Sequence, residues 1–417
     1  MTVIRTTSDV DVFVRRLRAL LTGNRAVFLV AVPLLIAALI WSWTRLHGYS
    51  LDLDVYRIGV QTWLAGGDMY GTLPQPVFGP VLPFIYPVFA AIVLVPLSVI
   101  PLGVAVFVMF ALSVLALTAA IYVTVRVVWP AGGRSGAVPL SMLVLAAALL
   151  IEPVAQTLAF GQINLVLMVM VLVDCLAPRT RLPRGVLIGL AAAIKLTPGG
   201  FVLFFLLRRD FRSAVVAAVT GIVATGVGFA VDPDASARYW FGGPAAGVSG
   251  STFFSNETIQ AVLARQDLTG LPFTVLWLVI VAILLVLAYP VIRRAEPATA
   301  LAATAAVILM ASPTSWSHHW VWVVPALIAV GAHAVRYRSV AWAAVGVVTA
   351  AMFYVAPFRW MPNVWGMQMR WSLWEQTLGA SYVIVAVITL ALGWWYYQCG
   401  PGAAGAVRHD VRTTAVG

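Results

Sequence analysis

The chain has 417 residues, of which 62% are hydrophobic and only 10% charged, with a mean hydropathy of +0.96. This composition excludes a water-soluble globular domain, and the continuous apolar runs argue against a β-barrel, whose strands alternate. The net charge of +11 does not indicate nucleic-acid binding, because the arginines form short clusters between apolar runs, as membrane topology signals do.

Twelve apolar runs follow one another along the chain, near 26–43, 84–100, 102–128, 138–151, 163–176, 186–207, 213–231, 271–292, 298–311, 320–334, 339–356 and 378–397. They predict an all-α polytopic membrane protein with roughly ten to twelve transmembrane or re-entrant helices. We expect one transmembrane domain over residues 26–398, beginning with a retained signal anchor. Residues 1–25 and 399–417 are then short cytoplasmic extensions.

The arginine clusters predict which side of the membrane each loop occupies. Arg15, Arg16, Arg18 and Arg25 precede the first run, which places the N-terminus in the cytoplasm. The later arginine clusters are also cytoplasmic only under two conditions. Residues 81–128 must cross the membrane an odd number of times, and residues 186–207 must enter the membrane and return to the same side. Pro198 and two glycines after Lys195 interrupt the second stretch and favour a hairpin. The alternative is a Pro-kinked span together with one exception to the positive-inside rule.

This topology gives five outer loops, 44–80, 152–163, 232–270, 312–319 and 357–377, which hold nearly all of the uncommon polar residues. We therefore predict one polar cavity that faces outward. Cys175 and Cys399 are isolated within apolar runs and indicate neither a disulfide nor a metal site.

Asp52 and Asp54 lie just after the first run, where a carboxylate can stay solvated while facing a substrate whose tail is in lipid. Because they are two residues apart, they do not share one face of a helix or strand. We expect Asp54 to face solvent or Arg57. From the spacing alone, ordinary solvation of a loop is the favoured interpretation of the pair.

Three further positions suit phosphate binding. Lys195 is a charge at membrane depth, which indicates a functional site by default, although a lysine that reaches the interface is the alternative. His318 and His319 are adjacent and point in different directions, so we do not expect them to share a metal ion. A neutral histidine is able to donate a hydrogen bond to a phosphate or a hydroxyl group.

Other polar and aromatic side chains of the outer loops are candidates for substrate binding. An aromatic and amide-rich loop suits a carbohydrate, whereas helix capping and membrane-interface anchoring are the simpler interpretations. The candidates are Tyr56, Glu152, Gln156, Gln162, Asn164, Asn256, Gln260, Arg265 and Trp316.

Six short motifs occur in order between about residues 50 and 325. The first two are Asp52-Leu53-Asp54-Val55-Tyr56 with Gly66-Gly67-Asp68-Met69-Tyr70, and 82–91 (LPFIYPVFAA). The others are Glu152-Pro153, 161–165 (GQINL), 193–198 (AIKLTP) and 312–320 (SPTSWSHHW). Together they resemble glycosyltransferase family 87 of the GT-C superfamily, in particular its polyprenyl-phosphate-mannose-dependent α-1,2-mannosyltransferases acting on phosphatidylinositol mannosides. Val88 stands where a second proline is usual.

The resemblance implies a helical GT-C fold in the plasma membrane with a periplasmic active site. It implies polyprenyl-phosphate mannose as donor, a glycolipid acceptor, inversion at the anomeric carbon and no cofactor or nucleotide sugar. It assigns the general base to Asp52, with Asp54 as second candidate, and puts one of His318 and His319 near the donor phosphate. Lipomannan, lipoarabinomannan and an arabinofuranosyl donor stay open as substrates.

Two other classes of protein fit the composition. A secondary transporter also has polar residues in a cavity, but it is expected to show an internal repeat, and none is evident. A scaffold protein would not need Lys195 or polar outer loops.

Overall fold

The computed structural model describes residues 25–46, 50–77, 79–243, 251–364 and 366–400. Over these residues the fold is all helical, without a β-strand. Eight helices are long and apolar enough to cross a membrane, and the bent pair α7–α8 makes a ninth if it counts as one span. Three shorter apolar helices accompany them. The prediction of a polytopic helical membrane protein with ten to twelve transmembrane or re-entrant helices is confirmed.

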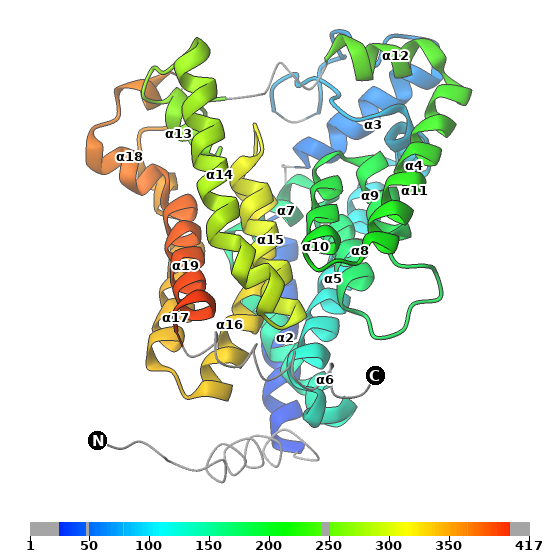
Figure 1. The fold of residues 1–417 in the computed structure, drawn as a ribbon. Helices are drawn as coiled ribbons and strands as arrows, with labels where there is room; N and C mark the ends of the chain where they lie inside the picture. Colours follow the sequence, from blue (N-terminus) through cyan, green and yellow to red (C-terminus); the bar gives the residue numbers. More distant parts are fainter. Residues whose placement is uncertain (1–24, 47–49, 78, 244–250, 365, 401–417) are drawn as a thin grey trace, which may run out of the picture.

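The helices that coincide with the predicted apolar runs form the bundle in Figure 1. They are α2 (Arg25–Thr44), α4 (Val88–Val99), α5 (Leu102–Val128), α6 (Gly133–Ala148), α8 (Asn164–Leu176), α9 (Val186–Ile194), α10 (Val202–Leu207), α11 (Phe211–Val231), α14 (Gly270–Arg294), α15 (Pro297–Ala311), α16 (Val323–Tyr337), α17 (Val340–Val355) and α19 (Ser381–Gln398).

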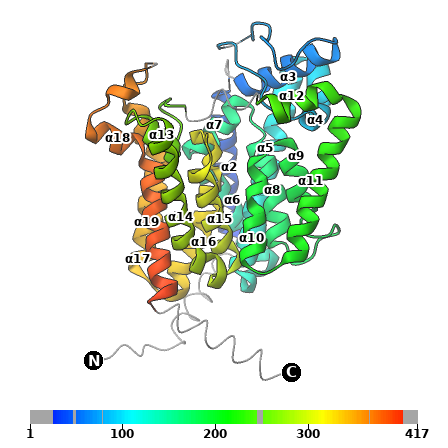
Figure 2. The same cartoon turned by 45° about the horizontal axis from the view of Figure 1, so that its top comes forward.

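One end of the bundle carries a layer of short helices (Figures 1 and 2). These are α3 (Leu51–Leu64), α7 (Glu152–Phe160), α12 (Pro233–Gly242), α13 (Ile259–Ala264) and α18 (Leu373–Gly379), with 3₁₀ turns η4 (Ser317–Trp322), η5 (Pro357–Trp360) and η6 (Met367–Arg370). They occupy the five predicted outer loops. Apolar-run analysis does not detect them, because they are short and only partly apolar.

The predicted hairpin over residues 186–207 is present as α9, the 3₁₀ turn η2 (Thr197–Phe201) and α10. Its two ends lie side by side: Gly185, before α9, has φ +101° and approaches the backbone of Ser213, which follows α10 in the chain. A Cβ atom on Gly185 would lie 2.2 Å from the Ser213 carbonyl oxygen, so this close approach requires glycine.

Helix α4, although it coincides with an apolar run, lies at the end of the bundle that carries α3. Near the end of α4, the Leu97 carbonyl accepts a hydrogen bond from Arg57, and the Ser98 carbonyl accepts one from Gln61 at 2.7 Å. Only α5 then crosses within residues 81–128, which meets the first topological condition. The helix connections that hold the described arginine clusters consequently gather at the end opposite to α3 (Figure 1). The structure of residues 1–24 and 401–417, which include most of the predicted extensions, lies outside the described residues.

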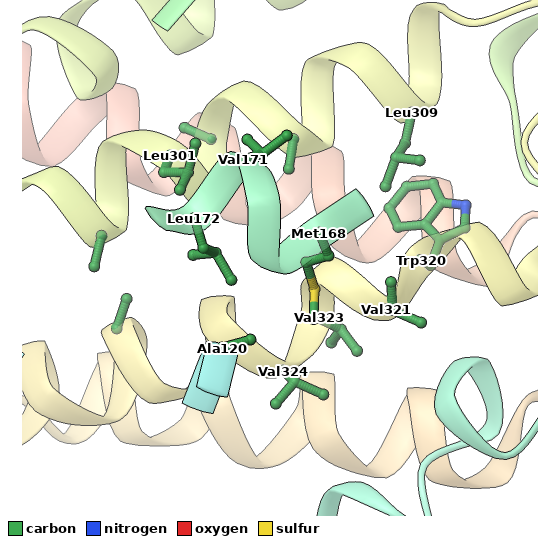
Figure 3. Packing of buried hydrophobic residues seen from close by; sticks show 14 of the residues in the cluster. Ala120, Met168, Val171, Leu172, Leu301, Leu309, Trp320, Val321, Val323 and Val324 are labelled. Atoms are coloured by element: carbon green, nitrogen blue, oxygen red, sulfur yellow. The ribbon is translucent and has the colours of Figure 1, made fainter. Parts of the chain in front are cut away.

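The core is a continuous set of aliphatic side chains between the helices (Figure 3). Met168, Val171 and Leu172 of α8 pack against Leu301 and Leu309 of α15, among other buried residues. This core fixes α8, α15 and η4 relative to one another, and these elements carry the polar residues described next.

Candidate active site

Asp52 lies in the first turn of α3, one of the helices of the layer described above. Its side chain is 21% exposed, and its Oδ2 lies 4.0 Å from Nε2 of His318. Neither of these two atoms has a hydrogen-bond partner among the described residues. Burial raises the pKa of Asp52 to about 6, while the ammonium of Lys195 and the amide of Gln162 lower it by smaller amounts. The Asp52 carboxylate therefore binds a proton more tightly than an exposed aspartate does.

A left-handed turn at Gly161 brings Gln162 to Asp52. Gly161 ends α7 with φ +64°, and a Cβ atom there would lie 2.7 Å from Cβ of Leu53. This close contact holds the α7–α8 corner, bent by 120°, against α3. Beyond the turn, Gln162 accepts a hydrogen bond from the hydroxyl of Tyr56, which lies 3.1 Å from the hydroxyl of Tyr86.

Lys195 ends α9 and points into the same region. Its Nζ donates to Oδ1 of Asn164 at 3.1 Å and lies 3.3 Å from Nε2 of His319. The ammonium also lies 5.6 Å from the ring centroid of Tyr86. Lys195, Asn164 and His319 line one small cavity together with Phe201 and Trp322. Among the residues that the structure describes, no carboxylate is hydrogen-bonded to Lys195, and a cation in this setting beside a cavity is suited to holding an anion.

The two adjacent histidines have different surroundings. Their rings are nearly perpendicular, at 88°, so that His318 faces Asp52 and His319 faces Lys195. The His318 carbonyl accepts hydrogen bonds from Thr157 at 2.8 Å and from Asn164 at 2.9 Å. These bonds fix η4 against α7 and α8. The predicted divergence of the pair is confirmed.

A carboxylate from α3, an ammonium from the end of α9 and two imidazoles from η4 therefore meet at one place. The family model of glycosyltransferase family 87 matches residues 84–313, more than half of the chain. The chain belongs to glycosyltransferase family 87. It is therefore a multi-pass membrane glycosyltransferase, as the motifs predict.

Its similarity to known family members extends over most of its length. It is 35% identical to the polyprenol-phosphate-mannose-dependent alpha-(1-2)-phosphatidylinositol mannoside mannosyltransferase of Mycolicibacterium smegmatis, over 87% of this chain and 86% of that protein. It is 36% identical to the protein of the same name from Mycobacterium tuberculosis H37Rv, over 83% and 86% of the two chains.

A second group of relatives is less similar. The polyprenol-phosphate-mannose-dependent alpha-(1-2)-phosphatidylinositol pentamannoside mannosyltransferase of Mycobacterium tuberculosis CDC 1551 is 30% identical over 89% of this chain and 87% of its own length. No solved structure matches significantly.

Asp54 was expected to face solvent or Arg57, and in this glycosyltransferase it does not face solvent. It is buried, and its Oδ2 accepts a hydrogen bond from the Val77 backbone at 2.9 Å. The attraction between Asp54 and Arg57 was predicted correctly, since the carboxylate raises the pKa of Arg57 against the larger lowering caused by burial. Asp54 thus ties the following loop to α3.

Glu152 is buried but belongs to a structural network. It accepts hydrogen bonds from Ser317 at 2.8 Å and from Tyr382 at 2.9 Å, and it pairs with Arg359 at 3.3 Å. Ser317 directly precedes His318. Glu152 therefore supports the histidine turn, and its contact with substrate stays a prediction.

Arg265 and Asn256 shape the loop that precedes η4. The Arg265 guanidinium donates to backbone carbonyls of five residues, Thr252, Phe253, Phe254, Asn256 and Gly379. The Asn256 side chain bonds the backbones of Ser251 and Ser315. Both side chains are buried, so the structure gives them a structural role, and the predicted contact with substrate stays a prediction.

Three remaining candidates stay at the margin of this arrangement. Trp316 packs edge-on against Phe253, with ring centroids 6.0 Å apart, and Gln156 and Gln260 are half-buried on α7 and α13. Tyr86 and Thr157, by contrast, belong to the site and were missed as site residues. Tyr86 lies inside one of the quoted motifs, which was the available signal.

Within the described ranges, no group of three or more His, Cys, Asp or Glu side chains is placed to hold a metal ion. Whether the reaction needs a metal or another cofactor stays a prediction from the resemblance.

Proposed function

We propose that this enzyme transfers mannose from polyprenyl-phosphate mannose to a phosphatidylinositol mannoside in an α-1,2 linkage, at the periplasmic face of the plasma membrane. The donor and acceptor classes are those in the names of the 35–36% identical relatives. The observation that carries the proposal is the unpartnered Oδ2 of Asp52, which faces a region bounded by His318 with Lys195 nearby.

In this reaction Asp52 takes the proton of an acceptor hydroxyl. The hydroxyl oxygen attacks the anomeric carbon from the face opposite to the phosphate, the bond between that carbon and the phosphate oxygen breaks, and polyprenyl phosphate leaves. One displacement of this kind inverts the anomeric configuration. A single base satisfies the requirement, since no second carboxylate has to act on the opposite side of the bond.

Lys195 and His319 bind the departing phosphate. The ammonium and the imidazole lie 3.3 Å apart beside one cavity, and they offer N–H donors to oxygens that gain negative charge as the bond breaks. His318 lies between this pair and Asp52, where its unpartnered Nε2 is placed to orient the acceptor hydroxyl.

The periplasmic assignment rests on the arginine distribution. The helix connections at one end of the bundle carry the described arginine clusters, and the site lies in the layer at the other end. By the positive-inside rule, the arginine-rich end is cytoplasmic.

The test is transfer by the purified protein in nanodiscs, with radiolabelled polyprenyl-phosphate mannose and a phosphatidylinositol mannoside. We expect a longer glycolipid whose new mannose is released by an α-1,2-specific mannosidase, together with free polyprenyl phosphate. Transfer from a nucleotide sugar, or from an arabinofuranosyl donor only, would overturn the proposal. Equal transfer to lipomannan would widen the acceptor class.

A further inference from the structure

Three side chains beside Asp52 are joined to one another by hydrogen bonds. They are Tyr56, Tyr86 and Gln162, and each is at most 6% exposed. Tyr56 lies four residues after Asp52 on α3, so these two side chains share one face of the helix. Tyr86 comes from the connection between α3 and α4, and Gln162 comes from the corner between α7 and α8. Three segments that are far apart in the sequence thus meet beside one carboxylate.

The backbone fixes the direction in which the Gln162 amide faces. The N–H group of Ile163 is only a donor, and it lies 3.0 Å from Oε1 of Gln162, so this atom must be the carbonyl oxygen of the amide. The hydroxyl of Tyr56 donates to the same oxygen. Because two donors hold the oxygen, the amide nitrogen is left to donate to other groups.

The three side chains close into a ring of hydrogen bonds with one direction. Tyr56 uses its single proton on Gln162, so Tyr86 is the donor in the 3.1 Å contact between the two hydroxyl groups. The hydroxyl oxygen of Tyr86 accepts from Nε2 of Gln162 at 3.4 Å, which completes the ring. Burial raises the pKa of both phenols, so each keeps its proton at neutral pH. Hydrogen bonds connected in this way strengthen one another.

This ring leaves one N–H of Gln162 for a partner outside it. The Gln162 amide forms a hydrogen bond with the Asp52 carboxyl, which lowers the pKa of Asp52 against the larger effect of burial. An amide that faced the other way would place its carbonyl oxygen against the carboxylate and repel it. The direction of the ring therefore decides whether Gln162 stabilises the ionised form of Asp52.

We propose that the ring of Tyr56, Tyr86 and Gln162 is a positioning device for the base. It holds one amide N–H on the carboxylate of Asp52, whose Oδ2 has no partner among the described residues and is free to take the acceptor proton. This inference rests on the proposed function, since it takes Asp52 to be the base. It departs from the substrate-binding role expected of Tyr56 and Gln162, because their donors are used within the ring and on Asp52.

Removal of the amide tests the role of Gln162. Gln162→Leu keeps most of the volume of the side chain and loses the N–H that stabilises the ionised base. The ascending limb of kcat/KM should therefore move upward by about one pH unit, while the KM for the acceptor stays at the wild-type value. The matched control is Gln61→Leu, which loses the hydrogen bond to the Ser98 carbonyl from the same helix as Asp52. This control should leave the limb near pH 6.

Removal of the two hydroxyl groups tests the ring, also where Gln162→Leu fails to fold. Tyr56→Phe and Tyr86→Phe each open the ring. The second keeps an aromatic ring beside the ammonium of Lys195, whose Nζ lies 5.6 Å from the ring centroid. We expect each variant to shift the limb upward, and the double variant to shift it by less than the sum of the two shifts, because a ring is opened only once. Additive shifts would show two independent contacts and overturn the ring.

The unfolding midpoint gives a test that does not depend on transfer. A carboxyl whose pKa is raised on folding contributes stability below its unfolded value, and this contribution is lost as the pH rises through the folded value. The loss that belongs to Asp52, measured as the difference from Asp52→Asn, should end near pH 6 in the wild type. In the Gln162→Leu background, the same difference should keep changing to about one pH unit higher.

The outcomes separate this inference from the proposed function. A limb that stays near pH 6 in folded Gln162→Leu, or a raised KM for the acceptor with an unmoved limb, would overturn the positioning role and leave mannosyl transfer intact. Absence of transfer by the wild-type enzyme would refute the proposed function. The midpoint series would then still decide whether Gln162 acts on Asp52.

Discussion

Oδ2 of Asp52 and Nε2 of His318 lie 4.0 Å apart, and neither atom has another partner among the described residues. The two side chains come from α3 and η4, far apart in the sequence. A buried polar atom without a partner is uncommon in native structures, and at an active site it is explained by a group that arrives with the substrate. We expect that group to be the acceptor hydroxyl.

Asp52→Asn should abolish transfer, because asparagine keeps the shape of the side chain and loses its basicity. Loss of a general base lowers the rate by about 10²–10⁴-fold. Asp54→Asn is the matched control: its amide oxygen is still able to accept from the Val77 backbone, so substantial activity should remain. Initial rates of mannose transfer provide the measurement. A dead Asp54 variant beside an active Asp52 variant would move the base to Asp54.

The Asp52 variant should also stay folded. Burial raises the pKa of this carboxyl to about 6 in the folded protein, above the value for an exposed aspartate. For an acid, that direction means that ionisation at neutral pH opposes folding, so asparagine removes a cost. The thermal unfolding midpoint at pH 7 should therefore equal or exceed that of the wild type.

The same pKa predicts how activity depends on pH. The base acts only when it is ionised, so kcat/KM should rise with pH through an apparent pKa of about 6 and level off above it. Below that value it should fall by about tenfold for each pH unit. Rates between pH 4.5 and 8 with subsaturating acceptor give the profile. An ascending limb near pH 4 would mean that burial does not raise the pKa of the base, and persistence of the limb in Asp52→Asn would mean that another group titrates.

Lys195→Ala and His319→Ala should each weaken use of the donor, because each removes a group beside the phosphate cavity. A charge-assisted hydrogen bond contributes about 1.5–3 kcal/mol, which corresponds to a tenfold or larger rise in KM. Donor KM and binding of polyprenyl phosphate are the measurements. His318→Ala should mainly lower kcat, since His318 faces Asp52. Wild-type donor kinetics in all three variants would make these residues structural.

Arg265→Ala should destabilise the enzyme without changing the KM of surviving protein. Its buried guanidinium bonds several backbone carbonyls, and leaving them unpaired should cost about 3 kcal/mol or more. Arg238, which pairs with Asp68 at the surface, is the matched control, and Arg238→Ala should barely shift the unfolding midpoint. A changed KM with unchanged stability would restore the substrate-binding role expected from the sequence.

Thiol labelling in intact cells tests the sidedness. Cys399 is exposed and is first replaced by serine, whereas Cys175 is buried. A cysteine at Asn363, exposed in the site layer, should react with an impermeant reagent, and one at Arg181, exposed in the α8–α9 connection, should not. The reverse pattern would place the site in the cytoplasm. The sequence places Ser317 in an outer loop, but Ser317 is buried, so a cysteine at this position would react poorly with the reagent.

Much of the architecture was predictable from local patterns. Most apolar runs became a single helix, and Pro198 with its neighbouring glycines marked the break after Lys195 that divides the run 186–207. Apolar length and breaker residues act within one segment, so a single segment contains the information. The motifs likewise identified Asp52, Lys195 and both histidines, since these residues stand in recognisable short contexts.

The tertiary structure alone decided what each polar side chain contacts. Asp54 and Arg265 looked like functional loop residues in the sequence, but Asp54 meets the Val77 backbone and Arg265 meets carbonyls from two segments. Tyr86 was not predicted as a site residue, because its partners come from α3 and the α7–α8 corner. A side chain's role depends on neighbours that distant segments supply, and the packing of helices determines those neighbours.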